Sequence, residues 1–67
     1  MEIAIRVNGL IEQSTATTLA GLVAERQLAS RSLVIELNGR VISQADWPTT
    51  RIAADDILEL LNFVGGG

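Results

Sequence analysis

Hydrophobic and polar residues alternate at the start of the chain. Ile3, Ile5 and Val7 share one face of an extended segment, and the residues between them share the other. This period of two predicts a half-buried β-strand at residues 2–7. An Asn-Gly pair follows, which suits the positive φ angles of a type I′ hairpin turn. We therefore expect residues 10–13 to return as a second strand.

The pattern then changes to helical spacing. Thr17 and Thr18 are both able to cap the start of a helix, because a threonine hydroxyl accepts hydrogen bonds from the unpaired backbone N–H groups there. Aliphatic residues continue at helical intervals, and they are Leu19, Leu22, Val23 and, toward the helix end, Leu28. This spacing predicts one helix that ends at residues 30–32.

Alternation returns at residues 33–37, and a second Asn-Gly pair leads into a short strand at residues 41–42. The segment 43–54 follows neither period and contains Trp47-Pro48. Because proline disfavours helix at the residue before it, we expect a connector with one helical turn here. Trp47 is expected to close an edge of the core and not to bind a ligand.

The final strand is predicted at residues 57–63, where Leu58 and Leu60 should face the core. The side chains expected on the opposite, outer face are Glu59, Leu61 and Phe63. One helix covers only one face of a sheet. The sequence therefore predicts an α+β fold, with a four- to five-stranded mixed sheet packed on one main helix, as a single domain over residues 1–63.

Side-chain chemistry is sparse in this chain. Its 67 residues include no Cys, His, Lys or Tyr, which excludes a thiol nucleophile, an imidazole base, a Schiff-base amine and a Cys/His metal site. We expect no catalytic residues, no bound cofactor and no metal. The net charge of −3 argues against nucleic acid or an anionic membrane as partner. With no apolar stretch of spanning length and no signal peptide, a cytoplasmic location is expected.

The most informative feature is the ending Val64-Gly65-Gly66-Gly67, which follows the last predicted strand directly. We expect residues 64–67 to form a flexible tail, because glycine has no Cβ and can enter a narrow channel in a partner. Gly65 and Gly66 would be the stalk, and Gly67 would present a carboxylate that is ionised at neutral pH. A carboxylate is unreactive until it is activated, so a partner must supply the activation.

Exposed apolar side chains beside a functional terminus are typical of a protein interface. The candidate partner-binding residues are Phe63, Leu61, Val64 and Val34. Phe63 is the first choice, because it is the only Phe and adjoins the stalk.

With these elements the chain resembles the ThiS family, the small ubiquitin-like sulfur carrier proteins of thiamine biosynthesis. The resemblance covers essentially the whole length and is carried by Asn8-Gly9, Thr18-Leu19, Leu37-Asn38-Gly39, Val41-Ile42, Asp46-Trp47, Thr49-Thr50, Asp56, Glu59 and Val64-Gly65-Gly66-Gly67. It implies a ubiquitin-like β-grasp fold. Asp55 stands where that family often has glycine, and aspartate tolerates left-handed backbone geometry.

The resemblance also implies a mechanism at Gly67. An ATP-using, ubiquitin-activating-like adenylyltransferase would attach AMP to the carboxylate. Sulfur relayed from a cysteine desulfurase would then displace AMP and leave a thiocarboxylate. A thiazole synthase would accept that sulfur during formation of the thiamine thiazole. The chain itself would not be an enzyme, since ATP is used by the activating partner.

Other functions stay open at this point. The nearest alternative is a sulfur carrier for another pathway, such as molybdopterin, cysteine or tRNA thiolation, although the short length and the Val-Gly-Gly-Gly ending favour the thiazole branch. It is also compatible with a ubiquitin-like protein modifier, or with a β-grasp binding module whose terminus is never activated. An acyl carrier protein fits the size and acidity, but the strand-rich pattern and the lack of an Asp-Ser-Leu helix start argue against it.

Overall fold

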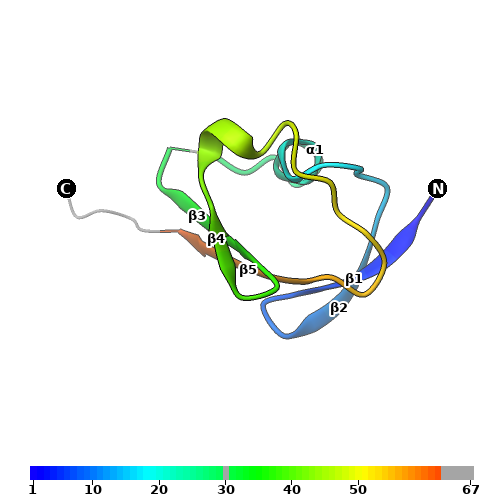
Figure 1. The fold of residues 1–67 in the computed structure, drawn as a ribbon. Helices are drawn as coiled ribbons and strands as arrows, with labels where there is room; N and C mark the ends of the chain where they lie inside the picture. Colours follow the sequence, from blue (N-terminus) through cyan, green and yellow to red (C-terminus); the bar gives the residue numbers. More distant parts are fainter. Residues whose placement is uncertain (30, 63–67) are drawn as a thin grey trace.

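One mixed sheet beneath a single α-helix makes up the fold (Figure 1), in a computed structural model that describes residues 1–29 and 31–62. In chain order the elements are β1 (Ile3–Val7), β2 (Leu10–Ser14), α1 (Leu19–Glu25), β3 (Leu33–Leu37), β4 (Arg40–Ile42), the 3₁₀ turn η1 (Gln44–Asp46) and β5 (Ile57–Asn62). The predicted order of elements is confirmed, including the single helical turn in the connector.

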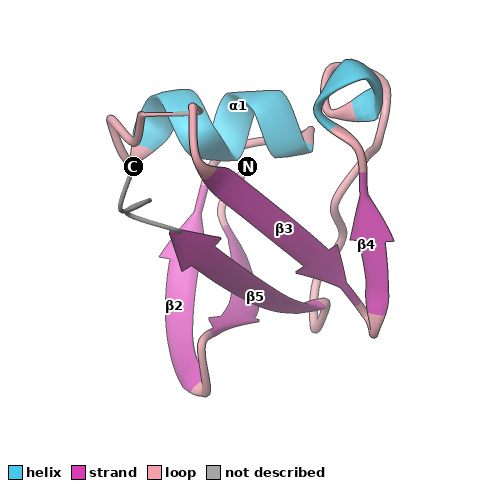
Figure 2. Cartoon of the chain, turned by 90° about the vertical axis from the view of Figure 1, so that its left-hand side faces the viewer, coloured by secondary structure: helices cyan, strands magenta, loops and turns pink. Residues whose placement is uncertain are grey.

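The five strands lie side by side in the order β2-β1-β5-β3-β4. β1 and β5 run parallel at the centre, while the other neighbouring pairs are antiparallel. Figure 2 shows α1 and η1 on one side of this sheet. The last strand in the sequence is therefore the middle strand in space, and the predicted α+β, ubiquitin-like arrangement is confirmed with five strands.

Both Asn-Gly pairs form the predicted hairpin turns. Asn8 and Gly9 have φ angles of 51° and 86°, and Asn38 and Gly39 have φ angles of 52° and 87°. Positive φ at both central residues is the requirement of a type I′ turn, and its twist matches that of the flanking strands. Asp55 also takes a left-handed conformation, with φ at 71°, as the tolerance of aspartate for this geometry suggests.

The helix is shorter than its spacing predicted. It begins with Thr18 as the N-cap, whose Oγ1 accepts a hydrogen bond from the backbone N–H of Gly21 at 3.1 Å. It ends at Glu25, so the expected end at residues 30–32 was wrong. Gln27 turns into the left-handed region at φ 56°, and the N–H of Leu28 donates to the carbonyl of Val23 at 3.1 Å. This pattern is that of a Schellman C-cap, which closes a helix on its own last carbonyls.

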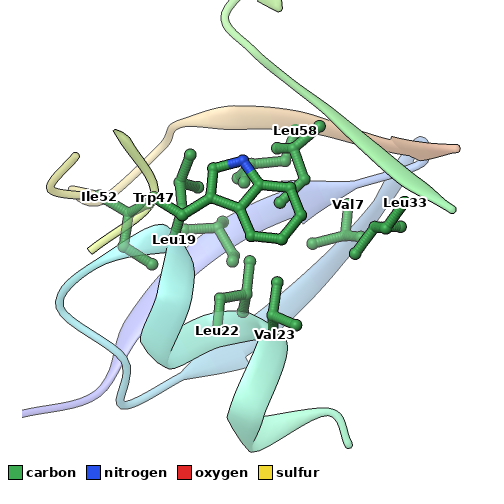
Figure 3. Close-up of a cluster of buried hydrophobic side chains, with 10 residues drawn as sticks. Val7, Leu19, Leu22, Val23, Leu33, Trp47, Ile52 and Leu58 are labelled. Atoms are coloured by element: carbon green, nitrogen blue, oxygen red, sulfur yellow. The ribbon is translucent and has the colours of Figure 1, made fainter. Parts of the chain in front are cut away.

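The core lies between α1 and the inner face of the sheet. Its most deeply buried side chains are Ile5, Leu19, Leu22, Ile35 and Leu58. Figure 3 shows the Trp47 indole among buried aliphatic side chains that include Leu19, Leu22 and Leu58. Trp47 is 4% exposed, and its Nε1–H donates to the carbonyl of Ile42 at 3.0 Å. Trp47 thus has the structural role that was predicted for it, as a member of the core.

The faces of β5 also match the prediction. Leu58 is completely buried and Leu60 is half-buried on the helix side of the sheet, while Glu59 and Leu61 are exposed on the other side. Sheet registers place the rest of the outer face, because residues paired across neighbouring strands project from the same face. The outer face is the surface on which the predicted docking residues were expected.

Candidate functional site

The residues predicted to carry the chemistry are Gly67, the stalk residues Gly65 and Gly66, and the adjoining Val64 and Phe63. All of them lie outside the described residues. The roles given to these positions, and the division of the chain into a domain and a tail, stay predictions. What the structure does place is the strand that leads to them.

That strand, β5, is held in the middle of the sheet by backbone pairing on both sides. Two asparagine side chains from the hairpin turns add to this pairing. Asn8 Oδ1 accepts from the N–H of Leu60 at 2.8 Å, and Asn38 Oδ1 accepts from the N–H of Ile57 at 2.9 Å. Both turns thus contact β5 directly, which fixes the position of the segment leading to the predicted tail.

Two of the predicted partner-binding residues meet on the outer face. Val34 of β3 and Leu61 of β5 are directly opposed in the antiparallel register. The Leu61 side chain is 39% exposed, and that of Val34 is half-buried. The structure therefore brings these two residues together next to Asn62, the last described residue of β5.

Further aliphatic side chains extend this face beyond the predicted set. Ile11, Val41 and Ile57 are 70%, 65% and 47% exposed, and register places all three on the same face as Leu61. An open hollow of about 280 Å³ adjoins two of them, Ile11 and Ile57, together with Arg6. Sequence reasoning missed these three residues, because a strand order that puts their segments side by side is not visible in local periodicity.

We define the outer sheet face as the side of the sheet opposite α1. Its residues are Ala4, Arg6, Ile11, Gln13, Val34, Glu36, Val41, Ile57, Glu59 and Leu61. Figure 2 shows α1 and η1 together on the other side. Exposed aliphatic groups gathered on a sheet face that no described helix covers indicate a surface suited to a protein partner.

The clearest polar cluster has a structural role. Glu25, at the end of α1, accepts hydrogen bonds from the Ser14 hydroxyl at 2.7 Å, the Thr15 N–H at 3.0 Å and the Thr15 hydroxyl at 2.8 Å. These hydrogen bonds lower the pKa of Glu25 below its ordinary value, and the bond from Ser14 has the largest effect. A carboxylate that is held ionised and already satisfied is a poor general base. Glu25 instead links β2 to α1 through these hydrogen bonds.

An ion pair between Arg26 and Glu12 joins the same two elements. Within residues 1–29 and 31–62, no three acidic, histidine or cysteine side chains lie close enough to hold a metal ion. No helix in this part of the chain is long and apolar enough to cross a membrane. The described part of the chain thus offers an exposed aliphatic sheet face and a firmly held last strand, and the partner-binding role of that face stays a prediction.

Comparison with solved structures gives the same architecture. The chain superposes on the crystal structure of the thiamine biosynthesis protein ThiS from Geobacter metallireducens with a TM-score of 0.77 and 28% identity, covering 97% of this chain and 100% of that one. A solution NMR structure from the same organism, titled as a thiamine biosynthesis protein, gives a TM-score of 0.78 at 26% identity, with 97% and 88% covered. The β-grasp fold of this chain is that of these proteins.

Two named relatives are similar in sequence. The sulfur carrier protein ThiS of Bacillus subtilis is 30% identical over 50 residues, which cover 75% of this chain and 76% of the relative. A thiazole synthase of Magnetococcus marinus is 33% identical over 64 residues, or 94% of this chain. This chain spans only 20% of the length of that synthase.

A family model settles the relationship. The ThiS family model matches residues 2–67, so it includes the hairpins, the Trp47 connector, β5 and the glycine ending. The resemblance drawn from the sequence is confirmed by this match together with the B. subtilis relative and the G. metallireducens structures. The chain belongs to the ThiS family.

Proposed function

We propose that this chain is a sulfur carrier protein whose Gly67 carboxylate is converted to a thiocarboxylate that donates sulfur for thiamine thiazole formation. The observation that carries the proposal is the family match over residues 2–67, since it extends through the glycine ending. The B. subtilis relative, named as a sulfur carrier, supports the same assignment.

The proposed chemistry proceeds in two displacements. A Gly67 carboxylate oxygen attacks the α-phosphate of ATP, forming an acyl-adenylate as the bond to pyrophosphate breaks. Sulfur at the sulfide level then attacks the carbonyl carbon, and AMP leaves with the electron pair of the broken C–O bond. The activating partner, an adenylyltransferase of the ubiquitin-activating type, supplies ATP and its site. A cysteine desulfurase relay supplies the sulfur as a persulfide. A thiol reductant then releases this sulfur at the sulfide level and is itself oxidised to a disulfide with the relay.

The composition of the chain agrees with this division of labour. The sequence has no Cys, so no thiol is present to hold the cargo, and the terminal carbonyl is the group on which sulfur would be carried. Asn8 and Asn38 hold β5, and Leu61 and Val34 offer partner contacts beside its end. In this proposal the chain contributes the carbonyl and its delivery, and the partners contribute the catalysis.

The proposed acceptor is a thiazole synthase. Support comes from the M. marinus relative, a thiazole synthase that contains a segment similar to nearly the whole of this chain. A carrier and its acceptor joined in one polypeptide gain a high effective concentration for each other. This favours the thiamine branch over carriers for molybdopterin, cysteine or tRNA thiolation.

Intact-mass spectrometry tests the proposal. The chain is incubated with ATP, its adenylyltransferase and a sulfur source, beside a variant that lacks Gly67. We expect the full chain to gain the mass of one oxygen replaced by sulfur, and the deletion variant to stay unchanged while it keeps the same far-UV circular dichroism. An unchanged full chain, in the presence of a partner proven active on another carrier, contradicts the proposal. In that case the binding-module interpretation replaces it.

A further inference from the structure

Two carboxylates oppose each other at the middle of the outer sheet face. Glu36 of β3 and Glu59 of β5 are directly paired in the antiparallel register. Side chains in this position have Cβ atoms about 4.5–5.5 Å apart, and two like charges there destabilise a sheet. The pair is an unfavourable choice for stability alone.

No other described residue offsets the repulsion between these two carboxylates. The carboxylates of Glu36 and Glu59 have no hydrogen bond or ion pair with any residue in the ranges 1–29 and 31–62, where Arg26 and Glu12 form the ion pair. Arg6, the cation on the same face, is aligned with Ile57 and makes no ion pair with a described residue. Within the described residues, no side chain neutralises these two charges.

Apolar side chains surround the pair. Val34 and Leu61 form the next register position toward the end of β5, and Val41 pairs with Glu36 from β4. Ile57 precedes Glu59 by two residues on the same face and is 47% exposed. A partner that covers these aliphatic groups excludes water around the two charges, which strengthens their interaction with opposite charges.

We propose that Glu36 and Glu59 are the specificity-determining centre of the docking surface for the ATP-dependent activating partner, and that they meet two arginine or lysine side chains set in an apolar surface. This inference rests on the proposed function. The activating partner must bring the Gly67 carboxylate against the phosphates of ATP, which are also anionic. Its site must therefore have a positive potential, and a carrier with a net charge of −3 is attracted to it.

The proposal predicts opposite effects on stability and on docking. Glutamine has nearly the shape of glutamate and no charge, so Glu36→Gln or Glu59→Gln removes the repulsion in the free sheet and also removes the attraction to the partner. Stability should rise slightly or stay constant while docking weakens. A residue with a purely structural role cannot give this combination.

Steady-state kinetics of adenylation, followed by pyrophosphate release, tests the pair. For each single variant we expect the KM for the carrier to rise about ten-fold with kcat unchanged, as for a lost charge contact at a docking interface. We also expect kcat/KM to fall less steeply with added salt than for the wild type, since one screened attraction is missing. Urea unfolding of the same samples should give a midpoint equal to or above that of the wild type.

Glu2→Gln is the matched control, because it removes the same charge from an exposed residue just before β1. β1 and β5 are parallel, so this residue lies at the end of the sheet away from Asn62. Figure 1 shows the N-terminus and the end of β5 on opposite sides of the molecule. The control should keep the wild-type KM. A KM that rises equally in Glu2→Gln shows that net charge alone matters, and it overturns the proposal.

Two further outcomes overturn it as well. One is an unchanged KM in both Glu36→Gln and Glu59→Gln, including the case in which these variants instead lose binding to the thiazole synthase. The other is a raised KM together with a lower urea midpoint. Adenylation of the wild-type chain tests the proposed function separately. If Gly67 of the wild-type chain is never adenylated, the sulfur carrier assignment itself fails.

Discussion

The side chain of Asn8 holds the backbone of Leu60, although the two residues are 52 positions apart in the sequence. Its Oδ1 accepts from the Leu60 N–H at 2.8 Å, and its Nδ2 donates to the Leu60 carbonyl at 3.3 Å. The side-chain amide of Asn8 thus makes the two hydrogen bonds to β5 that the backbone of a further β1 residue would make. A residue placed in the sequence for a turn also continues the central parallel pairing of the sheet.

We predict that Asn8→Gly lowers the free energy of unfolding by about 1–2 kcal/mol, because the hydrogen bonds to Leu60 are lost. Glycine tolerates the positive φ of the turn, so the loss of stability measures the contribution of the Asn8 side chain. Asn8→Asp retains the Oδ1 acceptor and should lose less than half as much. Urea unfolding followed by circular dichroism measures both variants, and equal losses in the two contradict the role given to the acceptor.

Trp47 gives the second prediction. Its indole is buried in the core, and its N–H satisfies the Ile42 carbonyl. Trp47→Ala should remove about 3–5 kcal/mol of stability through the cavity it leaves. A domain of this size has only about 3–10 kcal/mol in total, so we expect this variant to be largely unfolded at room temperature by far-UV circular dichroism.

Trp47→Phe tests the same position in a protein that should stay folded. We expect its free energy of unfolding to fall by about 1–3 kcal/mol. Ile11→Ala is the matched control, since Ile11 is 70% exposed and its truncation should change stability by less than about 0.5 kcal/mol. A fully folded Trp47→Ala protein with wild-type resistance to urea disproves the role of Trp47 in the core.

Glu25 predicts a dependence of stability on pH. Hydrogen bonds from Ser14 and Thr15 lower its pKa in the folded state. Its contribution is therefore complete above the unfolded value of about 4.3, and it is lost as the pH falls through the lower folded value. Glu25→Gln should be less stable than the wild type near neutral pH, and the difference should shrink as the solution is acidified.

Urea midpoints measured at several values from about pH 7 to about pH 3 test this linkage. Glu2→Gln serves as the control, because Glu2 is exposed and its carboxylate accepts no hydrogen bond from a described residue. The urea midpoint of Glu2→Gln should change with pH in the same way as that of the wild type. If the gap between Glu25→Gln and the wild type stays constant with pH, the ionised carboxylate is not the source of the stabilisation.

Leu61 tests the apolar part of the outer sheet face. Leu61→Ser should weaken binding to the activating partner about five- to ten-fold, since a partly exposed leucine beside the predicted tail is lost from the interface. The fold should change little, because the side chain is 39% exposed. Titration calorimetry measures the affinity.

Ile11→Ser is the matched control for this prediction. Ile11 lies on the same outer face but on β2, at the opposite edge of the sheet from β4. It should bind the partner nearly as tightly as the wild type. An equal loss in the two variants means that the partner recognises the face as a whole and not the region around Leu61.

Local sequence determined a large part of this protein. A period of two predicted the strands at residues 2–7, 33–37 and 57–63, and the two Asn-Gly pairs predicted the hairpins and their returning strands, because both signals depend only on neighbouring residues. The same periodicity placed Leu61 and Glu59 outward correctly. The glycine ending and its surrounding motifs identified the family. The helix start was narrowed to two threonines, Thr17 and Thr18.

Tertiary structure decided what local patterns do not contain. The helix ends at Glu25 because Gln27 adopts a left-handed conformation that the aliphatic spacing gave no sign of. Of the two candidate threonines, Thr18 is the cap in the structure, and its hydroxyl accepts from the N–H of Gly21. Above all, alternation within a strand shows which residues share a face but not which strands are neighbours. Only the order β2-β1-β5-β3-β4 brings Glu36 opposite Glu59, Val34 opposite Leu61 and Asn8 beside Leu60.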